Sequence, residues 1–316
     1  MEFGKVDQVQ GIDFQLPGDH PLCERILRTN PPSDHVPWLL GLTGWGEPSW
    51  RGDVYPPVCK PAYFLRTYAL SYSCVELNST FYHIPSSEQI QSWAKQVPPD
   101  FRFYPKVWQG ISHRKGFSPT LIPMFQEAMK GFGRHLGACF LQLPPTIDET
   151  NLPWLTDLLT QWDAGQQLFL EIRNPDLIRS EILLDLLQSL RIGLVLTDVP
   201  GHRDLAHMCL TTPSFLLRFV AANEEDIDRA RIRDWCQRLG QWASNGLHQA
   251  IVFCHTADNL HAPHLSRTWL EESQDFGISL NSGKTPLDYR VTNQKHCLSD
   301  GQGTLHASRY QLAILQ

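Results

Sequence analysis

Eight short apolar segments alternate with stretches of helical periodicity along most of this 316-residue chain. The segments cover residues 38–44, 74–80, 101–107, 138–144, 167–173, 193–198, 214–220 and 249–255. Each has the length of a strand, and the stretches between them repeat apolar residues at helical spacing. Because alternating strands and helices build parallel sheets, eight such units over about 250 residues predict an α/β fold. We expect a closed (β/α)8 TIM-barrel-like parallel barrel.

The two ends of the chain do not continue this alternation. Residues 1–36 are rich in polar residues and proline, and we interpret them as an N-terminal extension. Residues 279–316 follow the last helical stretch and form a C-terminal tail. The TIM-barrel-like domain is therefore expected over residues 37–278.

The composition of the chain indicates its cellular compartment and the kind of partner that it binds. The formal net charge of −6 and the absence of a basic run disfavour nucleic acid as a partner without excluding it. Eight cysteines without a C-x-x-C pair are typical of a reducing compartment. No signal peptide or long apolar run is present, so we expect a cytoplasmic protein with no membrane segment. The sequence does not indicate an oligomeric state.

Polar side chains recur at the carboxyl ends of the predicted strands. If Glu76 points into the barrel, period-two alternation places Asn78 there as well. The same alternation gives a polar last inward residue in seven strands: Asn78, Lys106, Gln142, Arg173, Asp198, Arg218 and His255. Barrel enzymes carry their active sites at this end of the strands. The sequence therefore predicts a functional site at the carboxyl-terminal mouth of the barrel.

The expected chemistry of this mouth is acid–base catalysis on an anion. Carboxylates from three strands can supply a general acid and a general base, and the cations can bind phosphate or carboxylate groups. The candidate catalytic residues are Glu76, Glu171, Asp198, Lys106 and His113. The candidate substrate-binding residues are Trp45, Asn78, Tyr82, Gln142, Arg173, Arg218 and His255. Alternatively, the charges form ion pairs that hold the mouth together, and the aromatic residues belong to the core.

No metal and no cofactor is expected. His255, His261 and His264 have spacing that a metal site can use, but histidines at the start of a helix are more often surface or capping residues. The glycines of GLTGWG, residues 41–46, lack the spacing of a dinucleotide-binding loop.

Four segments also share a pattern with known proteins: GLTGWGEPSWRGDVYPP (41–57), CVELNSTFYHIP (74–85), FLQLPP (140–145) and LEIRNP (170–175). They resemble the uncharacterised YecE-like family, domain-of-unknown-function family 72. The resemblance implies a TIM-barrel-like fold and no particular activity. The segment FCHTADNLHAPH (253–264) departs from the Phe-Asn-Asn pattern that the family tends to have after the eighth strand.

Two functional hypotheses follow from these patterns. The first is an enzyme that acts on a small polar or anionic substrate by carboxylate acid–base chemistry, of the hydrolase or isomerase type. The second is a non-catalytic binding protein for a phosphorylated metabolite or nucleic acid. Replacing Glu76 or Glu171 with glutamine separates them, because a binder of anions should keep its affinity and an enzyme should lose turnover.

Overall fold

The computed structural model describes residues 4, 6, 8–33, 35–113 and 120–280. The predicted tail, 279–316, lies outside the described residues after its first two positions. Residues 114–119, which follow His113, lie outside the described residues too.

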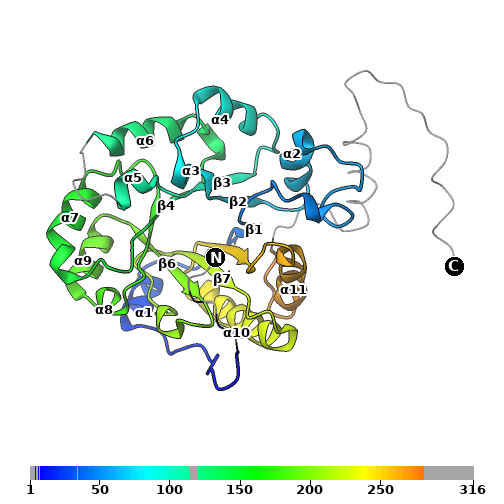
Figure 1. Cartoon of the computed structure of the whole chain (residues 1–316). Coiled ribbons are helices and arrows are strands. Elements are labelled where there is room, and N and C mark those ends of the chain that lie inside the picture. The colour runs from blue at the N-terminus through cyan, green and yellow to red at the C-terminus, as the bar shows by residue number, and fades with distance from the viewer. Residues whose placement is uncertain (1–3, 5, 7, 34, 114–119, 281–316) are drawn as a thin grey trace.

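Eight parallel strands surround a common axis (Figure 1). Their neighbour order is β3-β2-β1-β8-β7-β6-β5-β4. The remaining seam, between β3 and β4, is closed by two backbone hydrogen bonds, from Gly137 to Phe103 (2.8 Å) and from Val107 to Phe140 (2.9 Å). The predicted TIM-barrel-like fold is therefore confirmed. The strands are β1 (Trp38–Leu42), β2 (Cys74–Leu77), β3 (Arg102–Pro105), β4 (Cys139–Gln142), β5 (Leu168–Glu171), β6 (Gly193–Asp198), β7 (Ser214–Val220) and β8 (Gln249–His255).

Helices form the outer layer, and their starts follow local sequence signals. The Ser86 side chain caps one helix by accepting from the Gln89 backbone, and Asn174 caps another ahead of Pro175. The helices are α1 (Pro21–Arg28), α2 (Phe64–Tyr68), α3 (Ser79–Tyr82), α4 (Ser87–Ala94), α5 (Gln109–Ser112), α6 (Leu121–Lys130), α7 (Leu152–Thr160), α8 (Pro175–Ile178), α9 (Glu181–Ser189), α10 (Glu225–Ser244) and α11 (Ala262–Gln274).

The helix α1 belongs to the outer layer of the barrel although it precedes the first strand. After β6 the chain forms only a short 3-10 turn before β7, and α1 lies between α9 and α10 at this place in the ring (Figure 1). Arg25 of α1 donates to Gln188 of α9, and Trp242 of α10 donates to Asp19 just before α1. The N-terminal extension thus supplies the helical cover that the chain after β6 does not provide.

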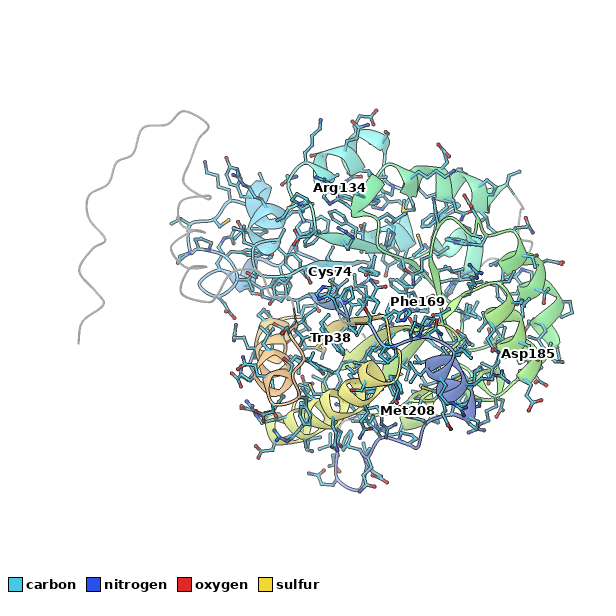
Figure 2. All side chains as sticks on the ribbon, turned by 180° about the vertical axis from the view of Figure 1, so that it is seen from behind. Trp38, Cys74, Arg134, Phe169, Asp185 and Met208 are labelled. Atoms are coloured by element: carbon cyan, nitrogen blue, oxygen red, sulfur yellow. The ribbon has the colours of Figure 1, made fainter. Side chains whose placement is uncertain are left out.

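Side chains fill the interior of the barrel. Figure 2 shows Cys74 and Phe169 in the middle of the molecule and Asp185 at its edge. A second, larger set of apolar side chains lies between the strands and the helices. The interior set is Leu39, Cys74, Tyr104, Ala138, Phe140, Phe169, Val195, Leu216, Ile251 and Phe253. The predicted alternation holds for the strands that contribute Cys74, Tyr104, Phe140, Phe169, Leu216 and Phe253.

The predicted inward face of β6 is wrong. Val195 belongs to the interior set, whereas Leu194 and Leu196 pack in the outer layer. Apolar residues occupy both faces of this strand, so hydrophobic alternation does not determine which face points into the barrel. The prediction then depended on the polar residue Asp198, which was expected to point inward. It points toward the helices instead.

Two further observations bear on the sequence-based expectations. Among the residues that the structure describes, no helix has both the length and the apolar character needed to cross a bilayer. Within the described ranges, seven cysteines are buried as free thiols: Cys23, Cys59, Cys74, Cys139, Cys209, Cys236 and Cys254.

The packing of α1 predicts that replacing a buried residue of this helix destabilises the whole barrel. Leu27 is 3% exposed, so Leu27→Ala should lower the free energy of unfolding by about 2–5 kcal/mol. Ile182→Ala is the matched control, because Ile182 is 71% exposed and should lose less than about 0.5 kcal/mol. Urea denaturation followed by tryptophan fluorescence measures both. Equal losses for the two variants would show that α1 does not share the core.

Candidate functional site

Six strands bring polar side chains together at the carboxyl-terminal mouth. The contacts described below join residues from β2, β4, β5, β7 and β8, and from the end of β3. We call this set the mouth cluster: Glu76, Asn78, Lys106, Gln142, Glu171, Arg173, Arg218 and His255. Most of its members are buried, and Glu76 and Glu171 have no exposed surface. Sequence alternation had placed all eight at this end of the barrel.

Arg218 stands at the centre of the mouth cluster and bonds both buried carboxylates. Its Nε and Nη2 donate to the two oxygens of Glu76 at 3.1 and 3.0 Å. Its Nη1 donates to the two oxygens of Glu171 at 3.0 and 2.8 Å. The planar guanidinium suits such paired contacts. One arginine from β7 therefore joins β2 and β5 across the barrel.

The two carboxylates accept further hydrogen bonds. Asn78 donates to Glu76 Oε1 at 2.8 Å, and His255 Nε2 lies 2.9 Å from Glu76 Oε2. Arg173 Nε donates to Glu171 Oε1 at 2.9 Å. A buried carboxylate needs partners of this kind to remain charged. The acceptor capacity of both glutamates is thus largely used within the cluster.

These contacts keep both glutamates ionised. Burial alone raises the pKa of a carboxyl group. At Glu76 the charge of Arg218 and the hydrogen bonds from Arg218 and His255 outweigh burial and hold the pKa well below its ordinary value, and at Glu171 Arg218 and Arg173 also lower the pKa. Burial lowers the pKa of His255, so its imidazole is neutral near neutral pH and Nε2–H donates to Glu76. Neither glutamate holds a proton to give to a substrate.

Lys106 has no carboxylate partner at ion-pairing distance among the described residues. Its Nζ donates to Gln142 Oε1 at 2.7 Å and lies 4.2 Å from the centre of the Phe81 ring. Burial lowers its pKa to about 8, and the charge of Arg218 lowers it further in the same direction. Arg173 Nη2 donates to the same Gln142 oxygen at 2.7 Å. Two cations therefore meet at one neutral oxygen.

Asp198 does not belong to the mouth cluster, contrary to the sequence-based expectation. Its oxygens accept from Arg231 Nη2 at 2.8 Å and from Trp235 Nε1 at 2.7 Å, both on α10, and it also pairs with Arg203. Asp198 contacts α10 because its side chain lies on the outward face of β6. The mouth cluster consequently holds three basic side chains and two carboxylates, so it carries a net positive charge when Lys106 is protonated.

The remaining candidates lie beside the cluster or away from it. His113 is exposed overall, and its ring contacts Phe81 edge-on at 5.1 Å. Partial burial of the ring, together with the charge of Lys106, lowers its pKa. Tyr82 is 67% exposed and also meets Phe81 edge-on. Trp45 packs against Trp93 at 5.4 Å in the outer layer, so the structure does not bring it to the mouth.

Sequence reasoning missed Phe81 as a member of this region. Its ring lies under Lys106 Nζ and contacts both His113 and Tyr82. The available signal was its position directly after the second strand, within the segment CVELNSTFYHIP. Phe140, beneath Arg218 at 5.7 Å, is a second aromatic neighbour of a buried cation.

The three histidines whose spacing a metal site could use do not converge. His255 bonds Glu76, His261 precedes α11, and His264 lies 3.9 Å from Glu225 on α10. Within the described part of the chain, no group of three metal-ligating side chains is present.

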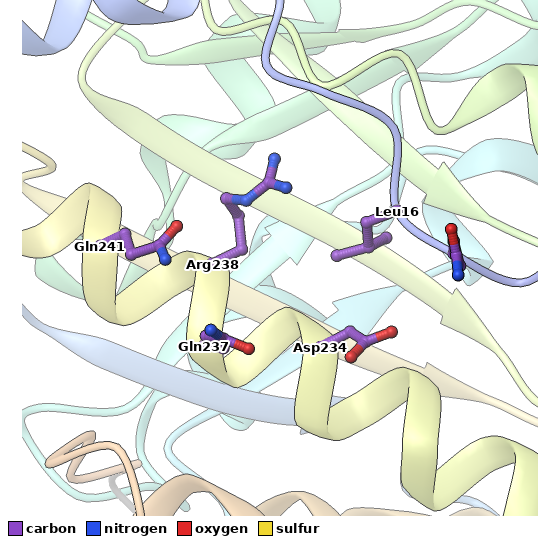
Figure 3. Close-up of a pocket in the computed structure, with 6 residues that line it drawn as sticks. Leu16, Asp234, Gln237, Arg238 and Gln241 are labelled. Atoms are coloured by element: carbon purple, nitrogen blue, oxygen red, sulfur yellow. The ribbon is translucent and has the colours of Figure 1, made fainter.

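A pocket of about 320 Å³ lies apart from the mouth cluster, between the N-terminal segment and α10 (Figure 3). Arg238 on its wall is already paired with Asp19. The lining residues are Gln15, Leu16, Asp234, Gln237, Arg238 and Gln241.

The position of Arg218 predicts a large, pH-dependent loss of stability on its removal. Arg218→Met leaves two buried carboxylates without their main partner, which should cost about 3–5 kcal/mol of unfolding free energy near neutral pH. Both glutamates have lowered pKa values in the folded protein, so their ionised form stabilises it above the unfolded-chain pKa, and this contribution is lost as the pH falls through the folded pKa. In Arg218→Met the carboxyl groups can take up protons, so the difference from wild type should shrink toward mildly acidic pH. Denaturation at several pH values measures it, and a loss below about 1 kcal/mol at neutral pH would contradict the central role of Arg218.

Comparisons with known proteins agree with this architecture. Residues 39–285 match the family model described as "Protein of unknown function DUF72". The UPF0759 protein YecE of Escherichia coli K12 is 28% identical over 263 residues, which is 74% of this chain and 91% of that protein.

Two DUF72 family crystal structures share the fold. The one from Enterococcus faecalis has a TM-score of 0.61 at 20% identity and covers 78% of this chain and 100% of its own. The one from Thermotoga maritima has a TM-score of 0.59 at 22% identity and covers 77% and 100%. The chain therefore belongs to the DUF72 family of proteins of unknown function.

Proposed function

We propose that the chain is an enzyme that binds a small anionic substrate at the carboxyl-terminal mouth of the barrel and acts on it by acid–base chemistry, of the hydrolase or isomerase type. The observation that carries the proposal is the meeting of Lys106 Nζ and Arg173 Nη2 at one neutral oxygen of Gln142. Three basic side chains face two carboxylates in the mouth cluster. This imbalance favours a ligand that brings a negative charge.

The anion is expected to bind at the position that the Gln142 oxygen now occupies. An amide oxygen carries only a partial charge, whereas an ionised oxygen forms a shorter and stronger hydrogen bond with the same donors. Arg173 is suited to this role because its side chain is 11% exposed at the rim, while Arg218 is 1% exposed and fully engaged with glutamates. The proposal therefore assigns ligand binding to Arg173 and Lys106, and a supporting role to Arg218.

The geometry changes which groups can transfer a proton. Carboxylate catalysis was the expectation, but Glu76 and Glu171 are ionised and bonded to Arg218. Lys106 has a pKa of about 8, so near neutral pH a useful fraction can accept a proton and the rest can donate one. We therefore assign the acid–base step to Lys106, with His113, whose ring contacts the same Phe81 ring, as a second titratable group.

A non-catalytic anion-binding protein is the second candidate function. The saturation of both carboxylates favours it, because a binding site needs no group free to exchange protons. A phosphorylated metabolite would use the same contacts with Arg173 and Lys106. Turnover of a small phosphorylated or carboxylated compound by the wild type, absent in Lys106→Met, would decide for the enzyme.

Substitution of Arg173 tests the anion site. Arg173→Lys keeps the charge but loses the planar pair of donors, so sulfate and phosphate affinity should fall about ten-fold or more, from ~1.5–3 kcal/mol per hydrogen bond to a charged group. Isothermal titration calorimetry measures the affinity, and melting temperatures monitor the fold. Arg134→Lys, at an exposed arginine in the 3-10 turn that precedes β4, is the control and should bind as wild type. Unchanged affinity with a melting temperature lower by several degrees would make Arg173 a structural partner of Glu171.

Sulfate binding should also weaken with rising pH. Lys106 attracts the anion only while protonated, and its pKa is about 8. Sulfate itself does not change charge over this range, so any change belongs to the protein. The wild type should therefore lose affinity as the pH rises through about 8, and Lys106→Met should bind weakly with little pH dependence. A wild-type affinity that stays constant across this range would exclude Lys106 from the anion site.

A further inference from the structure

We propose that Lys106 is a nucleophile that forms a covalent imine with the carbonyl carbon of a 2-oxo carboxylate held by Arg173. This inference rests on the proposed anion site and names the substrate class for it. Three features carry it: the placement of the lysine, the absence of a carboxylate beside its Nζ among the described residues, and the closeness of an arginine donor.

The backbone of Lys106 is fixed on both sides. Its N–H donates to Leu77 at 3.1 Å, and its carbonyl oxygen accepts from Thr80 Oγ1 at 2.7 Å. The next residue, Val107, donates to Phe140 on the β4 side of the seam at 2.9 Å. Lys106 is 8% exposed, so most of its side chain is buried within the mouth cluster. A lysine on a rigid strand end can hold its Nζ in one place for an incoming carbon atom.

The charges around Nζ favour the neutral, nucleophilic amine. Desolvation and neighbouring cations are the two means by which proteins activate lysine, and both act here. The carboxylates that would otherwise keep Lys106 protonated are bonded to Arg218. Arg218 and Arg173 lower the pKa of Lys106, and Glu171 and Glu76 raise it without offsetting burial. The aromatic partner Phe81 and the amide Gln142 complete the surroundings.

The spacing of the donors indicates the substrate class. Lys106 Nζ and Arg173 Nη2 are each 2.7 Å from the same Gln142 oxygen, so they are separated by at most twice that distance. A ligand that uses both must carry its anionic group close to its electrophilic carbon. In a 2-oxo carboxylate the carboxylate is bonded directly to the carbonyl carbon. One such molecule can therefore meet the guanidinium with its carboxylate and the amine with its carbonyl.

The covalent step is balanced without an added oxidant or reductant. The neutral amine attacks the carbonyl carbon, and a proton moves from nitrogen to the former carbonyl oxygen to give a carbinolamine. This hydroxyl leaves as water together with the remaining N–H proton, and the neutral imine nitrogen takes up one proton from solvent. The resulting iminium keeps the positive charge that the ammonium form of Lys106 had in the cluster. It also draws electrons from the neighbouring carbon, which makes a C–H bond there acidic and suits an isomerisation.

Reductive trapping tests the inference. The full chain is incubated with pyruvate and sodium cyanoborohydride, and intact mass and peptide mapping locate the adduct. We expect one reduced adduct per chain, located on Lys106, with a yield that rises toward about pH 8. Lys106→Arg should give no such adduct, and Arg173→Lys should give about ten-fold less at limiting pyruvate, the loss expected for one charged hydrogen bond. Lys95→Arg is the matched control, because Lys95 is exposed on the surface, and it should label as wild type.

The possible outcomes separate this inference from the proposed function. Adducts spread over surface lysines, or an equal yield in folded Lys106→Arg, would overturn the nucleophile. An unlabelled wild type that still binds sulfate would overturn the nucleophile and leave the anion site standing. A wild type that neither binds sulfate nor labels would remove both. If Lys106→Arg fails to fold, peptide mapping of the wild type alone decides, since it either finds the adduct on Lys106 or does not.

Discussion

The structure of the barrel mouth depends on one buried arginine. Arg218 joins glutamates from β2 and β5 through four hydrogen bonds and carries almost no exposed surface. Two ionised carboxylates could not remain in the interior without such a partner. In turn they hold the guanidinium, because a buried arginine cannot lose its charge. The three strands are therefore joined by an interaction whose members need one another.

This arrangement determines which groups remain available for chemistry. Since both carboxylates are committed to Arg218, the third cation of the cluster, Lys106, has only the neutral oxygen of Gln142 as its hydrogen-bond acceptor among the described residues. The same commitment keeps the glutamates ionised and removes them as proton donors. Burial leaves Lys106 with a pKa of about 8, and the charge of Arg218 acts in the same direction.

The sequence predicted this site well wherever a strand had a clear inner and outer face. In β2 and β5 the polar residue alternates with large apolar residues that face the helices, so Glu76 and Glu171 had only one plausible direction. In β6 the residues Leu194, Val195 and Leu196 fit either face. The inward direction predicted for Asp198 was wrong, because its partners Arg231 and Trp235 lie on a helix about 35 residues later in the chain. No local pattern contains such a long-range contact.

The place of α1 was hidden for a related reason. The polar, proline-rich N-terminal segment gives weak helical signals. The residues after β6 give no sequence signal that the helix expected between β6 and β7 is absent. Yet β6 is buried along its whole length, and a strand buried on both faces must be covered on the outside. Among the described residues, the segment that precedes β1 supplies a helix at this place, and the bonds of Arg25 and Asp19 attach it to α9 and α10. The family model begins at residue 39, after this helix. The core of the chain therefore extends beyond the residues that the family model matches. Asp198 joins β6 to α10 within the matched part and does not belong to the mouth.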